Sequence, residues 1–200
     1  THPEEIIEKI KDQSKTSQLS GSKILITAGP TREPIDPVRF MSNYSSGKMG
    51  YAIAMAAKAK GASVELISGP VALNPITDIR TTYVETSSEM YEAVKEKVSD
   101  FDIFISTAAI ADYKPANYSD TKYKKNENNI TIEFTRGIDI LETISKKHKN
   151  LFTVGFAAET NSLKENTQQK LAKKNLDLIV GNIANHELKL GFESDYNEVI

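Results

Sequence analysis

The sequence contains no cysteine, and its three histidines lie far from one another in polar surroundings. The missing thiols exclude a disulfide, a thiolate nucleophile and a cysteine-based metal site, and they suit a cytoplasmic protein. Because no two histidines have the spacing of a metal-binding helix, solvated surface histidines are favoured over a zinc site.

Long apolar runs and an excess of positive charge are also missing. No apolar run approaches the length that a membrane span needs, so we expect no membrane partner. The formal net charge of −2 gives no sign of nucleic-acid binding. A length of 200 residues is enough to bury the core of one globular domain.

Segment 23–69 has the pattern of a β-strand, a long loop, a helix and a second strand. Ile24, Leu25 and Ile26 form a continuous apolar run, as in a parallel strand that is covered on both faces. An alanine-rich helix follows the loop and ends at Gly61. This order predicts the first βαβ unit of an α/β fold.

The loop between the first strand and the helix is about twenty residues long, whereas such connections normally take two to six. Pro30, Pro34 and Pro37 lie within it, and each proline fixes its own φ angle. A long loop that is not simply disordered is usually functional, so we expect a functional role for it.

Strands and helices continue to alternate in the rest of the sequence. Apolar runs predict further strands over 102–109, 130–134, 152–158 and 176–180. Periodic patterns predict helices over 86–100, 140–149 and 162–175, the first of them with a capping box at Thr86 and Glu89. The sequence therefore predicts a Rossmann-like α/β fold, with a doubly wound, mostly parallel sheet and a lid or hairpin insertion.

The start of the first helix is one candidate ligand site. Ser45, Ser46, Gly47 and Lys48 provide hydroxyl groups and unpaired backbone N–H groups, which suit a phosphate. They match neither the P-loop nor the dinucleotide fingerprint, so a phosphate cradle and an ordinary serine cap are both open. Asn43 can donate and accept hydrogen bonds in a site, or it can be a turn residue.

In a doubly wound sheet, ligands bind beyond the carboxyl ends of the strands. Ser106, Thr107 and Ala108 lie at such an end, where small side chains let a planar group approach the backbone. Asp112 follows and could hold a magnesium ion that bridges phosphates. The alternative is an ordinary loop aspartate.

Two groups of lysines are further candidates for binding a polyphosphate. Lys122 lies in a polar loop that could close as a lid. Lys170 and Lys174 are one helical turn apart with no acid between them, so an anion could lie between their side chains. Solvated surface lysines are the alternative in both cases.

Taken together, these motifs resemble bacterial phosphopantothenoylcysteine synthetases of coenzyme A biosynthesis. The resemblance covers residues 22–200 and rests on ITAGPTREPIDPVRFMSNYSSGKMG, ELISGPVAL, AAIADYKP, TKYKK, GFAAET, KNLDLIVGN and GFESDYN. In many bacteria this synthetase follows a flavin-dependent decarboxylase. The resemblance therefore implies a leader or linker over 1–21 and a synthetase domain over 22–200 whose C-terminal end is incomplete. FMN would belong only to the fused decarboxylase.

The resemblance implies a two-step ligation. The carboxylate of 4'-phosphopantothenate attacks the α-phosphate of CTP, which gives an acyl-cytidylate and pyrophosphate, and the amine of L-cysteine then displaces CMP. It also implies a homodimer in which the long loop and the lid build a shared site. The choice of CTP over ATP rests on the resemblance alone.

The resemblance further implies roles for single residues. Asn43 would hold the acyl group together with Ala108 and Ala109 and assist the second step, and Lys122 would support the first. Asp112 would serve the nucleotide and its magnesium. The implied nucleotide contacts are Ser106, Thr107, Ala108, Asp112, Lys122, Ile138, Asp139, Ile140, Leu141, Phe156, Lys170 and Lys174. Ile138 stands where the family usually has proline.

Two other functions remain open from the sequence. An NAD(P)-dependent oxidoreductase should carry a glycine fingerprint, and the expected glycines are missing between Ala28 and Gly50. A non-catalytic nucleotide-binding regulatory domain would bind CTP but would release no pyrophosphate.

Overall fold

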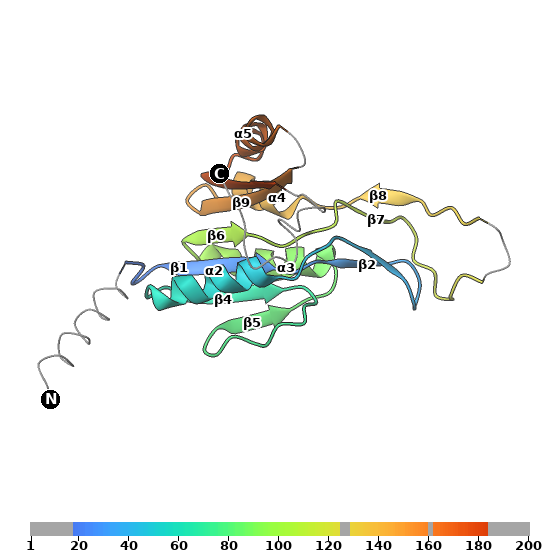
Figure 1. Ribbon diagram of the computed structural model, residues 1–200, viewed down its shortest axis with the longest axis horizontal. Coiled ribbons are helices and arrows are strands. Elements are labelled where there is room, and N and C mark those ends of the chain that lie inside the picture. Colours follow the sequence, from blue (N-terminus) through green and yellow to red (C-terminus); the bar gives the residue numbers. More distant parts are fainter. Residues whose placement is uncertain (1–17, 125–128, 160–161, 184–200) are drawn as a thin grey trace, which may run out of the picture.

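The computed structural model describes residues 18–124, 129–159 and 162–183, so most of the predicted leader lies outside the described residues. The chain forms a six-stranded sheet in the order β10-β9-β6-β1-β4-β5 (Figure 1), and all five pairs of neighbours are parallel. The strands are β1 (Lys23–Ala28), β4 (Ser63–Ser68), β5 (Arg80–Tyr83), β6 (Ile103–Ser106), β9 (Phe152–Glu159) and β10 (Leu178–Ile183). The predicted doubly wound α/β fold is confirmed.

Helices cover both faces of this sheet. They are α2 (Lys48–Ala59), α3 (Ser87–Lys97), α4 (Ile140–Lys147) and α5 (Leu163–Lys174), with a short 3₁₀ turn, η1 (Val98–Asp100), after α3. Ile24 and Ile26 pack toward α2, whereas Leu25 belongs to the core on the α3 and α4 side. Alternate residues of β1 therefore enter two different cores, which explains its unbroken apolar run. Within the described part of the chain, none of the helices combines the length and apolarity that crossing a membrane requires.

The helix ends follow the predicted signals. The Thr86 Oγ1 atom accepts a hydrogen bond from the N–H of Glu89 at 3.1 Å, and the Glu89 carboxylate accepts one from the N–H of Thr86 at 3.2 Å. This is the predicted capping box of α3. Lys60 caps the C-terminus of α2, and Gly61 follows with a φ of 89°, a left-handed conformation that glycine adopts without strain.

The strand predicted over 102–109 leaves the main sheet after Ser106. Its neighbour β1 turns away at Gly29, which has a φ of 75°. The next residues follow this turn, because the Ala109 N–H donates to the Gly29 carbonyl at 2.9 Å and the Thr31 N–H donates to the Ala109 carbonyl at 3.4 Å. The long loop, residues 29–47 and hereafter the first loop, is thereby attached to the end of β6.

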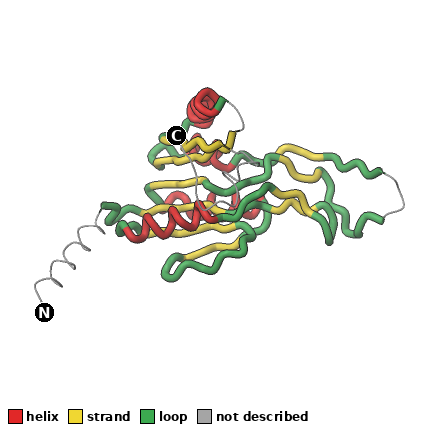
Figure 2. The backbone as a smooth tube through the Cα atoms, in the orientation of Figure 1, coloured by secondary structure: helices red, strands yellow, loops and turns green. Residues whose placement is uncertain are grey.

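Two antiparallel ribbons project beyond the carboxyl ends of the sheet (Figure 2). The first loop contributes β2 (Arg32–Pro34) and β3 (Phe40–Ser42). Residues 113–124 and 129–136, hereafter the arm, contribute β7 (Tyr113–Pro115) and β8 (Phe134–Arg136). The strand predicted over 130–134 is thus shifted, since only Phe134 lies in β8. Ile130 is 55% exposed, because no sheet face covers this part of the alternating pattern.

The buried carboxylate of Asp36 joins the first loop to the arm. One of its oxygens accepts hydrogen bonds from the N–H groups of Val38 and Arg39, both at 2.8 Å. The other accepts from the Arg39 guanidinium at 2.6 Å and from the Tyr123 N–H at 3.2 Å. Burial by itself raises the pKa of Asp36, but these hydrogen bonds outweigh burial and hold the pKa below its usual value.

Acid should weaken this junction. Because the pKa of Asp36 is lower in the folded chain, its stabilising effect is fully present above the ordinary value of 3.8 and is lost as pH falls through the folded-state pKa. Between about pH 6 and pH 3, we expect the free energy of unfolding to fall more in the wild type than in Asp36→Asn, which lacks the titrating group. Urea unfolding measures this difference, and equal pH dependence in the two proteins would contradict it.

Gly69, which follows β4, packs directly on the first loop. A Cβ atom at this position would lie 1.8 Å from the Pro30 carbonyl oxygen, so the backbone itself would have to move. We expect Gly69→Ala to lower the free energy of unfolding by about 3 kcal/mol and the melting temperature by about 6–12 °C. Gly137→Ala is the matched control, because the nearest atoms there would lie 3.4 Å away. Equal stability of the two variants would refute the close approach.

Candidate active site

A cleft of about 1520 Å³ opens beyond the carboxyl ends of the strands. It exceeds the about 300–1,000 Å³ that is common for a single small ligand. The end of the first loop and the start of α2 form one part of its lining, and the ends of β6, β9 and β10 form another. The predicted site residues that line it are Asn43, Ser45, Ser46, Gly47, Lys48, Thr107, Ala108, Ala109, Asp112 and Phe156.

Asn43 connects the first loop to the chain beyond β6. Its Nδ2 atom donates a hydrogen bond to the Ile110 carbonyl oxygen at 3.0 Å. Because a carbonyl oxygen only accepts, this bond orients the amide and leaves Oδ1 as an acceptor in the cleft. Ala108 and Ala109 line the same cleft, so the structure brings together the three residues that were expected to hold an acyl group.

Just before α2, the side chains of two serines accept hydrogen bonds from backbone N–H groups. The Ser45 hydroxyl accepts from the Gly47 N–H at 3.3 Å, and the Ser46 hydroxyl accepts from the Lys48 N–H at 3.4 Å. Neither serine is the N-cap, because Gly47 takes that position and no side chain caps the helix, so the ordinary serine cap does not form. Both serines line the cleft, and a phosphate there stays a prediction. Gly50 holds this helix end against the strand ends, since a Cβ there would lie 2.5 Å from the Thr107 hydroxyl.

Of the predicted residues at and after the end of β6, some line the cleft and one does not. Thr107 lines the cleft and donates its hydroxyl to the Thr27 carbonyl at 2.6 Å, whereas Ser106 is buried and does not line it. Asp112 is exposed at the cleft. Among the described residues, no group of three or more His, Cys, Asp or Glu is placed to hold a metal ion. A single carboxylate suits Mg²⁺ that is also bound by phosphates and water, as is usual for this ion.

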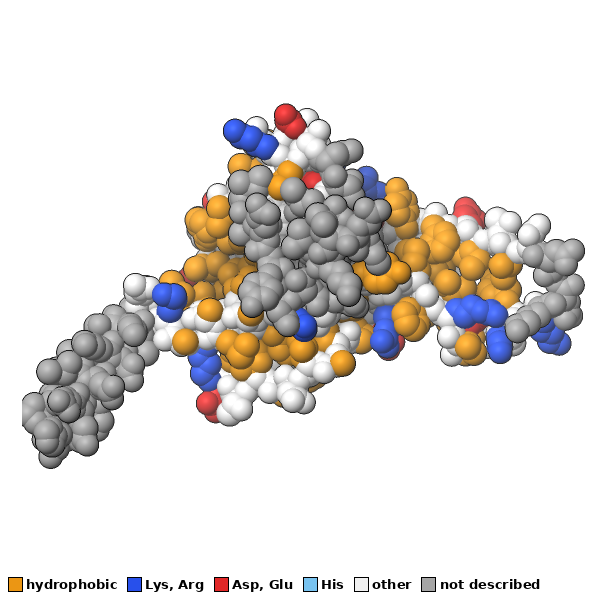
Figure 3. Space-filling model, in the orientation of Figure 1, with side chains coloured by type: hydrophobic (Ala, Val, Ile, Leu, Met, Phe, Trp, Pro, Cys, Tyr) orange, Lys and Arg blue, Asp and Glu red, His pale blue; other side chains and the backbone are white. Residues whose placement is uncertain are grey.

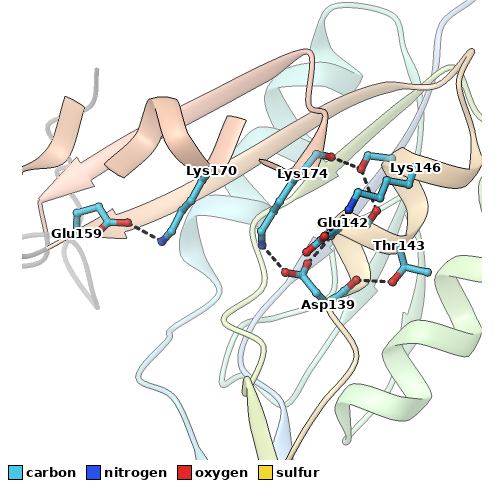
Figure 4. A network of polar contacts seen from close by, with 8 residues as sticks. Asp139, Glu142, Thr143, Lys146, Glu159, Lys170 and Lys174 are labelled. Atoms are coloured by element: carbon cyan, nitrogen blue, oxygen red, sulfur yellow. Dashed lines mark hydrogen bonds and ion pairs between the residues drawn. The ribbon is translucent and has the colours of Figure 1, made fainter. Parts of the chain in front are cut away.

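The two lysines of α5 each have an acidic partner from another element (Figure 4). Lys170 lies 2.5 Å from a Glu159 oxygen, and Lys174 lies 2.8 Å from an Asp139 oxygen. The premise that these lysines have no acid nearby is therefore wrong, and an anion between them stays a prediction. Spacing along α5 showed no acid nearby, because the acids come from β9 and from the residue that caps α4. Neither lysine lines the cleft.

The segment before and at the start of α4 is divided between surface and core. Asp139 caps α4, because its carboxylate accepts from the Glu142 N–H at 3.0 Å. Ile138 is 47% exposed, whereas Ile140 and Leu141 are buried. The side chains of these two buried residues pack in the core, so only their backbone could contact a nucleotide. None of residues 138–141 lines the cleft.

Lys122 is exposed on the arm and does not line the cleft either. It lies next to Tyr123, whose N–H bonds to Asp36. The described structure therefore attaches this lysine to the first loop but does not bring it to Asn43 or Asp112.

Some lining residues were not singled out from the sequence. Leu73, Pro75 and Ile76, in the loop after β4, form an apolar wall of the cleft, and this segment has no periodic pattern that would reveal it. Asn182 lies at the end of β10. Residues 180–182 are one of the strand ends at which the sequence predicts ligand binding, so this position agrees with that prediction.

Comparison with known proteins identifies relatives over almost the whole chain. The family model of the DNA/pantothenate metabolism flavoprotein C-terminal domain matches residues 19–200. Coenzyme A biosynthesis bifunctional protein CoaBC of Vibrio vulnificus (strain YJ016) is 48% identical over 184 residues, which cover 90% of this chain and 46% of that protein. The chain thus spans about half the length of the curated relatives that it matches.

Solved structures agree with this match. The C-terminal domain of a CoaBC protein is 43% identical, with a TM-score of 0.74 over 91% of this chain and 86% of that one. A Cab2 variant in complex with phosphopantothenate-cysteine is 17% identical, with a TM-score of 0.70 over 90% of this chain and 76% of that one. The second similarity concerns the fold alone. Together with the match at residues 19–200, the first similarity shows that the chain belongs to the family of DNA/pantothenate metabolism flavoprotein C-terminal domains.

Proposed function

We propose that this chain is a phosphopantothenate–cysteine ligase of coenzyme A biosynthesis that uses CTP. The observation that carries the proposal is one cleft that joins Asn43 and the start of α2 to small strand-end residues and Asp112. Its volume of about 1520 Å³ can accept two substrates side by side. Relatives named as CoaBC support the pathway, and a Cab2 variant of the same fold has a solved structure in complex with phosphopantothenate-cysteine.

In the first step, a carboxylate oxygen of 4'-phosphopantothenate bonds to the α-phosphorus of CTP, and pyrophosphate leaves. In the second, the amine of L-cysteine bonds to the acyl carbon, CMP leaves, and the amine loses a proton. Asn43 orients the acyl group through the free acceptor and the second N–H of its amide. Thr107, Ala108 and Ala109 let the planar groups of the substrates approach the backbone.

Asp112 fits a magnesium ion that arrives with the nucleotide. Such an ion neutralises phosphate charge, which lets a carboxylate approach the triphosphate. The exposed carboxylate of Asp112 would hold one side of it, and the phosphates and water the other. The hydroxyl-rich start of α2 then binds a phosphate group at the opposite end of the cleft.

We further propose that the chain forms a homodimer, in which Lys122 of one subunit reaches the cleft of the other. Apolar side chains gather on the projecting part of the molecule (Figure 3). In the first loop, Val38 and Tyr44 are 60% and 70% exposed, and on the arm Tyr113 and Tyr118 are 55% and 50% exposed. Such a patch suits a protein interface, and a second copy of the chain would cover it and supply its lysine.

Residues 22–200 would be the synthetase domain of a longer cytoplasmic protein, and residues 1–21 would link it to a decarboxylase domain that binds FMN. A pyrophosphate-release assay with 4'-phosphopantothenate, with CTP and ATP in parallel, tests the function. We expect release that depends on phosphopantothenate and CTP, followed by CMP release when cysteine is added. Binding of CTP without pyrophosphate release would instead indicate a regulatory domain.

A further inference from the structure

The side chain of Asn182 is largely buried at the lining of the cleft, and no described residue holds its amide. The residue is 6% exposed, it lines the cleft, and it makes no hydrogen bond with any described residue. A primary amide carries two donor hydrogens and an acceptor oxygen, and nearly all buried polar groups in folded proteins are paired. The amide of Asn182 can therefore form hydrogen bonds with a ligand in the cleft.

The sheet places Asn182 on the same face as Phe156. Asn182 pairs with Ala158 and Val180 pairs with Phe156 along β9 and β10, and residues two apart in a strand share a face. The intervening Gly181 faces α5, since a Cβ there would lie 2.8 Å from the Thr167 hydroxyl. Asn182 and Phe156 therefore both face away from α5, and both line the cleft.

We propose that Asn182 recognises the base of the nucleotide, a role that rests on the proposed function. An aromatic ring beside a free amide suits a nucleobase, because the base can pack on the ring and present its hydrogen-bonding edge to the amide. With cytosine, Oδ1 accepts from the 4-amino group and Nδ2 donates to the ring nitrogen N3. No residue in the described part of the chain fixes the orientation of the amide, so it adds affinity for a base without choosing between amino and keto bases.

The folded chain does not depend on the amide of Asn182 for a hydrogen bond to a described residue, so losing the amide should not cost stability. Leucine has nearly the same shape as asparagine but no polar atoms, and replacing an unpaired buried polar group by an apolar one is neutral or stabilising. A structural asparagine would behave in the opposite way, because its loss would leave partners unsatisfied. The effect of Asn182→Leu on melting temperature therefore separates a ligand-binding role from a structural one.

Calorimetric titration of the chain with CTP and with inorganic tripolyphosphate tests the role. We expect Asn182→Leu to weaken CTP binding about tenfold, since one or two hydrogen bonds in a buried site are lost. Tripolyphosphate has no base, so its affinity should not change. The melting temperature should stay the same or rise. Asn150→Leu is the matched control, because Asn150 is exposed and does not line the cleft, and we expect it to bind CTP as the wild type does.

Each other result would overturn the role. Unchanged CTP affinity in Asn182→Leu would show that the amide does not contact the nucleotide. A lower melting temperature with equal weakening of CTP and tripolyphosphate would show a structural residue. If the wild type bound no CTP, the proposed function would fail and this role with it, whereas normal binding by both proteins would remove this role alone.

Discussion

Aspartate in place of Asn43 should trap the acyl-cytidylate. The second step brings an amine to the acyl carbon, and a new carboxylate there would repel the developing negative charge. Aspartate also cannot donate to the Ile110 carbonyl, which Asn43 reaches at 3.0 Å, so two oxygens would face each other. We expect CMP release to fall by on the order of 10²–10³-fold, as when an oriented donor is lost from an active site, and pyrophosphate release to fall much less.

Rapid quenching with labelled CTP, followed by chromatography, measures the trapped intermediate. Asn43→Ala is the matched control, since it loses the hydrogen bond to Ile110 without adding charge. Accumulation in Asn43→Asp but not in Asn43→Ala would identify the charge as the cause. Equal slowing of both half-reactions, with no intermediate, would refute the proposed role of Asn43.

Glutamine in place of Lys122 should abolish pyrophosphate release. Attack of a carboxylate on a triphosphate brings two anions together, and a lysine that reaches the transferring group stabilises the added charge. We expect a loss on the order of 10³-fold in the first step. Lys124→Gln, two residues away on the same exposed part of the arm, is the control and should keep its activity. Normal release by Lys122→Gln would exclude the lid role.

The position of Lys122 outside the cleft also allows a test of the shared site. Asn43→Asp and Lys122→Gln subunits can be mixed and allowed to exchange. If the lysine acts across a dimer, half of the dimers are mixed, and each has one site with both wild-type residues. Activity should then recover to about one quarter of the wild-type rate. If both residues act within one subunit, mixing should restore nothing.

Local patterns predicted the fold well. The capping box at Thr86 and the apolar run of β1 involve residues that are close in sequence. Their structure can therefore be predicted from the local sequence alone. Strand β5 was not predicted, because the sequence RTTY of an edge strand has no apolar alternation to reveal it. The end of β6 was set too late, since it depends on how Gly29 turns a different strand.

The sequence predicts those site residues whose positions follow from the strand order alone. Asn43, Asp112 and Phe156 line one cleft because parallel strands end at the same edge. The partners of Lys170 and Lys174 were not predictable, because Glu159 and Asp139 come close only through packing of β9 and α4 against α5. The strand-end rule does predict a ligand position at Asn182, but the burial of its side chain is a property of the folded chain.

The hydrogen bond between Asn43 and Ile110 joins residues 67 positions apart, which has a consequence for folding. Closing so long a loop costs entropy that is recovered only after β1 and β6 lie side by side. The sheet must therefore form before the cleft does. A chain that has completed its sheet but not yet attached its first loop would already be compact, yet Asn43 would still be separate from the strand ends that line the cleft.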